Sequence, residues 1–72
     1  IGADAFYYKK RPEGFDQLKS GGRVVIEDDV HIGALCTIDR GVTGDTTIGA
    51  GSKLDNHIQI GHDTVVGKKC LF

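Results

Sequence analysis

A period of six residues constrains the fold of this chain more than any other feature. Large apolar side chains recur at that spacing in two runs, at Ile26, Ile32 and Ile38 and then at Ile48, Leu54, Ile60, Val66 and Phe72. A glycine directly follows four of them, at Gly33, Gly49, Gly61 and Gly67. An α-helical period of 3.6 cannot hold a strict spacing of six, and plain strand alternation would not place glycine at a fixed corner. The period therefore predicts short strands joined by tight turns.

Each repeat is expected to direct two side chains inward, the large one and a smaller one four residues later. The smaller set is Val30, Cys36, Val42, Ser52, Ile58, Thr64 and Cys70. With three repeats per coil, the large residues stack on three faces: Ile26 with Ile48 and Val66, Ile32 with Leu54 and Phe72, and Ile38 with Ile60. Hexapeptide repeats are a signature of the parallel β-helix. The predicted fold class is therefore all-β, a parallel β-helix of hexapeptide repeats.

Two segments depart from the period. The step from Ile38 to Ile48 is ten residues, so four extra residues within 41–46 are expected to bulge from one corner. Residues 3–22 do not fit the repeat, and their aromatic arms around Pro12-Glu13-Gly14 predict a hairpin or a long loop. We therefore expect a single partial β-helix domain over residues 1–72, with an excursion over 3–22 and coils over 23–72. Little more than two coils without polar caps indicates a fragment or truncated relative of a longer solenoid, whose open ends should associate.

Composition narrows the function classes. The chain has 9 Lys and Arg residues against 10 Asp and Glu residues, a formal net charge of −1, so nothing in it calls for nucleic acid or an anionic membrane as a partner. No apolar run is long enough for an integral membrane segment. Cys36 and Cys70 fall at inward positions, where we expect small buried hydrophobic residues and not a disulfide or a nucleophile. A cytoplasmic location without a cofactor or metal is the expectation.

The three histidines, His31, His57 and His62, all fall near predicted corners. Asp55 precedes His62 by seven residues, one repeat plus one, which places the two near neighbouring corners of one coil. Such corners form clefts across subunit boundaries. A carboxylate that hydrogen-bonds an imidazole fixes its tautomer and raises its basicity, as a general base requires.

Several blocks resemble, in order, those of the UDP-3-O-acylglucosamine N-acyltransferases. They are Ile38-Asp39-Arg40-Gly41, Thr47-Ile48-Gly49, and the run from Leu54 to Asp63, LDNHIQIGHD. The opening IGADAF is similar to that family's I-G-A-D-G-F segment. The resemblance implies left-handed coiling and a homotrimer. It also implies transfer of a 3-hydroxyacyl chain from acyl carrier protein to the 2-amine of a UDP-linked acylglucosamine, in lipid A synthesis.

The resemblance also assigns roles to residues. It makes His62 the general base and Asp55 its orienting carboxylate, and it places Asn56 and Gln59 in the acceptor or pantetheine cleft. Phe6, in the opening segment, is the further substrate-binding candidate.

The chain departs from the family pattern at Gly61, where alanine is usual, and at Asp63, where asparagine is usual. Ala5 and Tyr7 stand in place of glycines around Phe6, so this loop is expected to hold a different sugar or none.

Other interpretations stay open. A truncated β-helix could persist as a non-catalytic trimeric scaffold, and other hexapeptide-repeat sugar acetyltransferases share the repeat and a corner histidine. A γ-class carbonic anhydrase would need three protein ligands for zinc, and the spacing of His57 and His62 does not match its paired ligands. Whether the chain turns over a substrate by itself is left open by the sequence.

Overall fold

The computed structural model describes residues 1–72 and contains strands but no helix, so the all-β prediction is confirmed. The strands are β1 (Tyr8–Arg11), β2 (Gly14–Gln17), β3 (Arg23–Ile26), β4 (His31–Ile32), β5 (Thr37–Ile38), β6 (Asp45–Ile48), β7 (Lys53–Leu54), β8 (Gln59–Ile60) and β9 (Val65–Val66). Most contain only two residues. That length is what corners at every sixth residue allow.

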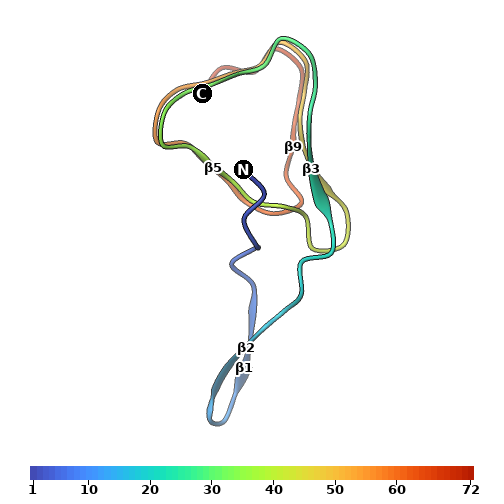
Figure 1. Ribbon diagram of the computed structural model, residues 1–72, viewed down its shortest axis with the longest axis vertical. Coiled ribbons are helices and arrows are strands. Elements are labelled where there is room, and N and C mark those ends of the chain that lie inside the picture. Colours follow the sequence, from blue (N-terminus) through green and yellow to red (C-terminus); the bar gives the residue numbers. More distant parts are fainter.

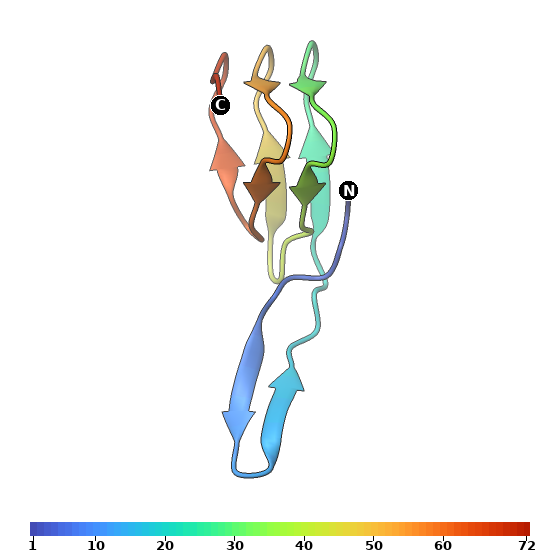
Figure 2. The ribbon, with the colours of Figure 1, turned by 90° about the vertical axis from the view of Figure 1, so that its left-hand side faces the viewer.

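Strands β3 to β9 form three small parallel sheets, β3-β6-β9, β4-β7 and β5-β8. Figure 1 looks along the axis about which the chain winds, and the successive turns superimpose in a triangular outline with one sheet on each side. Figure 2, turned by 90°, shows the turns side by side. Strands far apart in sequence therefore become neighbours, and each residue of one coil lies over its equivalent in the next.

The register confirms the stacking predicted from the period. Ile26 pairs with Ile48, and Ile48 pairs in turn with Val66. Ile32 pairs with Leu54, and Ile38 pairs with Ile60. An isolated bridge between Lys53 and Leu71 continues the second side, so that Phe72 follows opposite Leu54.

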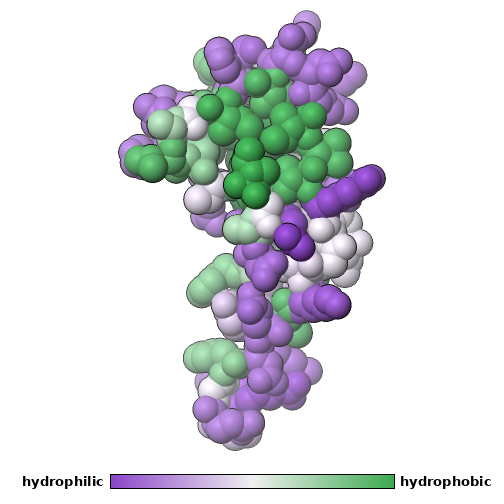
Figure 3. All heavy atoms as spheres, in the orientation of Figure 1, coloured by the Kyte–Doolittle hydropathy of each residue, from purple (hydrophilic) through white to green (hydrophobic).

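The core runs along the middle of this stack. Ile38 and Ile48 are completely buried, and Leu54, Ile60 and Val66 are each 4% exposed. Complete burial of such a side chain contributes about 1.5–3 kcal/mol. Burial is incomplete at the two ends of the stack, where Ile26 is 40% exposed and Phe72 is 49% exposed. Figure 3 shows the resulting apolar surface, gathered inside the triangular outline where one end of the stack faces the viewer.

The smaller inward set was predicted less well. Ser52 is fully buried, as expected, but Thr64 is exposed, so that prediction was wrong. Val42 is only half-buried, and Thr46, fully buried two residues before Ile48, takes the inward position instead. The reason is the insertion: the chain bends at residues 42–44 and regains the repeat where β6 begins.

The glycines after the large residues have a different role from the predicted one. The left-handed corner residue lies three positions after the large residue in every repeat except the one interrupted after Ile38. These corner residues are Asp29, Leu35, Gly51, His57, Asp63 and Lys69. Gly49, in contrast, has no positive φ, but a Cβ added there would lie 2.6 Å from the carbonyl carbon of Gly67. Glycine is therefore needed at Gly49 because the coils approach closely, and not because the chain turns there.

Side chains at the corners tie one coil to the next. The Oε1 atom of Glu27 accepts a hydrogen bond from the backbone N–H of Ala50, at 3.0 Å. The Oδ1 atom of Asn56 accepts one from the backbone N–H of Ala34, at 2.7 Å. These bonds satisfy backbone donors that the irregular corner conformation leaves outside the sheets.

The excursion is a β-hairpin, one of the two forms predicted. Strands β1 and β2 pair antiparallel from Tyr8–Gln17 to Arg11–Gly14, and the hairpin projects away from the coils (Figure 2). Its base is fixed by a buried hydrogen bond, 3.0 Å long, from the Ala5 N–H to Ser20 Oγ.

Ahead of the hairpin, an isolated bridge joins Ala3 to Asp39. This register puts Gly2 opposite Ile38 and leaves Ile1 78% exposed, so the opening Ile1-Gly2 does not repeat the inward pattern. No helix in the structure is long and apolar enough to cross a membrane.

Candidate functional site

The candidate site lies at the corner that follows β8. Here Gly61, His62 and Asp63 turn the chain, with Asp63 in the left-handed conformation at a φ of 57°. The Asp63 N–H donates to Thr46 Oγ1 at 2.9 Å, so the corner is fixed on the preceding coil. The insertion at residues 41–44 borders the same corner, since it holds the backbone donors that bind the Asp63 side chain.

The Asp63 carboxylate collects hydrogen bonds from the insertion. Its Oδ2 accepts from the Val42 N–H at 2.8 Å, and its Oδ1 accepts from the Gly44 N–H at 3.0 Å. The hydrogen bond from Val42, followed by that from His62, lowers the pKa of Asp63 from 3.8 to about 2. Hydrogen bonds to the ionised form have this effect on a carboxyl group. Asp63 is therefore a carboxylate throughout the neutral range.

His62 is held on two sides. Its Nδ1 lies 2.8 Å from Asp63 Oδ2, and its ring stacks on Tyr7 with a centroid separation of 5.4 Å and an interplanar angle of 10°. The His62 side chain is 36% exposed. An ionised carboxylate can only accept, so the short contact requires a proton on Nδ1. Nε2 makes no hydrogen bond within the chain and is the nitrogen open to a reactant.

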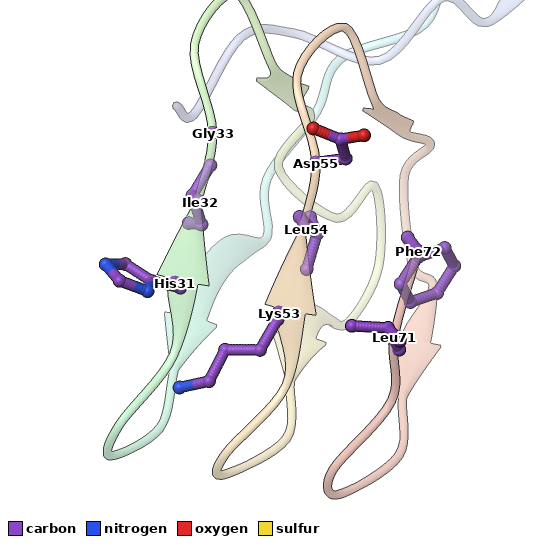
Figure 4. Close-up of a pocket in the computed structure, with 8 residues that line it drawn as sticks. All are labelled: His31, Ile32, Gly33, Lys53, Leu54, Asp55, Leu71 and Phe72. Carbon is purple, nitrogen blue, oxygen red and sulfur yellow. The ribbon is translucent and has the colours of Figure 1, made fainter.

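Asp55, predicted to orient His62, lies at a different corner, the one after β7. Its Oδ1 accepts from the N–H of Asn56 at 2.7 Å, and it makes no hydrogen bond with His62 within one chain. It borders a shallow pocket over the second sheet, which does not include His62. Figure 4 shows that pocket, with His31, Lys53 and Leu71 at equivalent positions on three adjacent segments.

The other predicted site residues are dispersed. The Asn56 amide oxygen is already used between two coils, and Gln59 is an exposed residue of β8 paired with Thr37. Phe6 is 85% exposed and meets Tyr8 edge-on, with ring centroids 5.1 Å apart. Together with Tyr7 and Phe15, these two aromatic residues line an apolar hollow on the hairpin.

The sequence selected His62 as a candidate but did not select the two side chains that contact it, Asp63 and Tyr7. Asp63 follows His62 directly and had been noted only as a departure from a motif, although adjacency at a corner was an available signal. Tyr7 was also noted only as a departure from a motif. No local pattern indicated its contact with His62, because the two residues are 55 positions apart in the sequence.

Cysteines and metal-ligating side chains are the other groups of the chain with possible chemistry. No group of three or more His, Cys, Asp or Glu side chains within the chain lies close enough to hold a metal ion. Both cysteines are free thiols at half-buried positions, and Cys36 Sγ donates to the carbonyl oxygen of Asp55 at 2.9 Å.

These observations define the class: an all-β chain of stacked three-sided coils, with a histidine–carboxylate pair at a solvent-accessible corner. Comparison with known proteins then gives the family. The chain is 50% identical to a UDP-3-O-acylglucosamine N-acyltransferase of Rhizobium johnstonii over 70 residues, which cover 97% of this chain and 20% of that protein. Relatives of the same name from Azorhizobium caulinodans and Methylorubrum extorquens are 49% and 46% identical over 71 residues.

The predicted family resemblance is therefore confirmed, as homology to UDP-3-O-acylglucosamine N-acyltransferases across nearly the whole chain. The chain spans about a fifth of the length of these curated relatives. No family model matches it.

Proposed function

We propose that this chain carries part of the active site of an N-acyltransferase that acts in lipid A synthesis in the cytoplasm. The observation that carries the proposal is the homology over 97% of the chain to proteins named UDP-3-O-acylglucosamine N-acyltransferase. The proposed reaction transfers a 3-hydroxyacyl group from acyl carrier protein to the 2-amine of a UDP-linked acylglucosamine. In this proposal the coils are a segment of a left-handed parallel β-helix.

His62 is the proposed general base. The amine nitrogen attacks the thioester carbonyl, the new C–N bond forms, and the C–S bond breaks. Nε2 of His62 accepts the proton that the amine loses, and the thiolate of the carrier leaves and is protonated. The geometry supports this role because Nε2 makes no hydrogen bond within the chain while Nδ1 is engaged.

The site is proposed to be completed in a homotrimer. Within a single chain His62 makes no hydrogen bond with Asp55, Asn56 or Gln59 and no ring contact with Phe6. Association of three copies would bring corners of neighbouring subunits together. In that assembly Asp55 would face His62 across a subunit boundary. Asn56, Gln59 and Phe6 would line the cleft for the acceptor sugar or the pantetheine arm. The family resemblance, which implies a homotrimer, supports this part of the proposal.

The test is acyl transfer by the purified chain. The amine acceptor and 3-hydroxyacyl carrier protein are mixed with the chain, and the N-acylated sugar is measured by mass spectrometry. A general base contributes about 10²–10⁴-fold, so His62→Gln should lower the rate by that factor. His31→Gln, a change of the same type in β4 of the first coil, should leave the rate unchanged.

The trimeric scaffold is the outcome that would replace this proposal. If light scattering shows a trimer and the trimer forms no product, the chain is a structural module and the catalytic function is wrong for it.

A further inference from the structure

We propose that Asp63 is the positioning residue of His62: its carboxylate binds the Nδ1 proton and leaves Nε2 as the proton acceptor, while Tyr7 fixes the plane of the ring. This inference rests on the proposed function for its catalytic consequence. It assigns to a residue of the same chain the role that the family resemblance implies for Asp55.

The first step compares the hydrogen bonds that Asp63 and Asp55 make. His62 Nδ1 is 2.8 Å from Asp63 Oδ2, whereas Asp55 is hydrogen-bonded to its own neighbour Asn56 at 2.7 Å. The tautomer of a histidine is set by the hydrogen bond that one ring nitrogen makes. With Nδ1 occupied by Asp63, an Asp55 from a neighbouring subunit could meet His62 only at Nε2 or through the substrate.

The second step is that Asp63 is itself immobilised. Three N–H groups converge on its two oxygens: Val42 and His62 on Oδ2, and Gly44 on Oδ1. Its own N–H is bound to Thr46 Oγ1 at 2.9 Å. The carboxylate is thus held by two N–H groups of the insertion, and the backbone of the same residue is held by Thr46, so the position of the insertion fixes the oxygen that meets the imidazole. Such support lets a catalytic group keep its orientation without reorganisation.

The third step concerns the charge and the plane of the ring. An amide has one acceptor oxygen, so asparagine at position 63 could not accept from all three donors, and its NH₂ group would face one of them. Tyr7 covers one face of the ring, nearly parallel at 10°, so the ring rotates only by losing that contact. The hairpin base and the insertion therefore act on the same imidazole from different sides.

The experiment measures the tautomer directly, without activity. The whole chain is labelled with ¹⁵N-histidine, and the ring nitrogens of His62 are assigned by comparison with His62→Gln. The expected result near neutral pH is a protonated Nδ1 and an unprotonated Nε2 for the neutral ring. Asp63→Asn should shift the population toward the Nε2–H form, which unrestrained imidazoles prefer.

The matched control is Asp29→Asn. Asp29 occupies the equivalent left-handed corner position at a φ of 59°, against 57° for Asp63, and its carboxylate makes no hydrogen bond with another residue. Asp29→Asn and Asp55→Asn should both leave the His62 tautomer unchanged. Tyr7→Leu should remove the ring-current shift of the His62 ring protons.

The outcomes separate the two proposals. An Nε2–H tautomer of His62 in the unmodified chain overturns the role of Asp63, even if acyl transfer is observed. An unchanged His62 tautomer in a folded Asp63→Asn variant also overturns it. If Asp63→Asn fails to fold, the tautomer of the unmodified chain still decides. Where the chain is active, Asp63→Asn should lower kcat more than it raises KM, and by less than the loss in His62→Gln. Absence of transfer together with an Nδ1–H tautomer refutes the proposed function and retains the positioning contact.

Discussion

Replacing glycines one position after the large inward residues tests whether close coil approach controls the stability of this fold. In Gly49→Ala the new Cβ would lie 2.6 Å from both the carbonyl carbon and the carbonyl oxygen of Gly67. Carbon atoms in contact are normally about 3.5–4.0 Å apart, so the coils would have to separate by roughly 1 Å. In Gly61→Ala, at the equivalent position of another face, the nearest atom is the Thr64 Oγ1 at 4.0 Å.

The magnitudes follow from these distances. Overpacking costs about 1–3 kcal/mol, and backbone atoms cannot rotate out of the way, so Gly49→Ala should lie toward the upper end. Neither glycine has a positive φ, so both variants also gain about 0.4–1 kcal/mol from a less flexible unfolded chain. We expect a net loss of about 2 kcal/mol for Gly49→Ala and a small gain for Gly61→Ala.

Thermal unfolding followed by circular dichroism measures the difference. For a chain of this size, 1 kcal/mol corresponds to about 4–8 °C in Tm, so the two Tm values should differ by roughly 10–20 °C. Equal Tm values would refute the reasoning, because they would mean that coil spacing yields readily to a methyl group. A large loss in Gly61→Ala alone would show that this corner packs against something outside the single chain.

Three further predictions concern the core and the site. Ile48→Ala should lower the free energy of unfolding, measured by urea denaturation, by about 2–5 kcal/mol, because Ile48 is fully buried. Ile26→Ala should lower it clearly less, because Ile26 is 40% exposed. Similar losses in the two variants would contradict the described core. Ser52→Ala should lower the free energy of unfolding by about 1–3 kcal/mol. The Ser52 Oγ donates to the Gly67 carbonyl at 2.8 Å and accepts from the Cys70 N–H at 3.0 Å. An unchanged free energy of unfolding would mean that water replaces both bonds. The pKa of Asp63 is lowered from 3.8 to about 2, so its stabilising effect is complete above pH 4 and is lost as the pH falls toward 2. The Tm difference between the unmodified chain and Asp63→Asn should therefore narrow over that interval, and a constant difference would contradict the linkage.

Stacking was predictable from the sequence because it depends on spacing alone. Once three repeats make a coil, residues 18 positions apart, such as Ile48 and Val66, must lie over one another, and the same count with four inserted residues pairs Ile26 with Ile48. Burial was less predictable because it depends on how many coils cover a position. Thr64 has the sequence position of an inward residue, yet it is exposed on the last coil, while Thr46 in the middle coil is fully buried.

The site was only partly predictable, for a related reason. His62 could be selected because corners expose polar side chains and a histidine at neutral pH can transfer protons. Its partners depend on contacts that no local pattern encodes. Asp63 faces the ring because it adopts the left-handed conformation and because the insertion supplies two N–H donors. The position of Tyr7 depends on where the hairpin base joins the coils, which the repeat does not specify.

The interruption of the repeat is therefore also what organises the candidate site. A regular coil would have a simple corner in place of residues 41–44, and Asp63 would lose the Val42 and Gly44 donors that hold both of its oxygens. Without them the carboxylate would have no bond to the neighbouring coil, and nothing but its own backbone would orient it toward Nδ1. The same four residues therefore interrupt the regular stack and hold the side chain at one corner in place. Irregular segments on a rigid scaffold are where binding and catalytic groups concentrate. In this chain the insertion and the hairpin base, the two departures from the six-residue period, both act on His62.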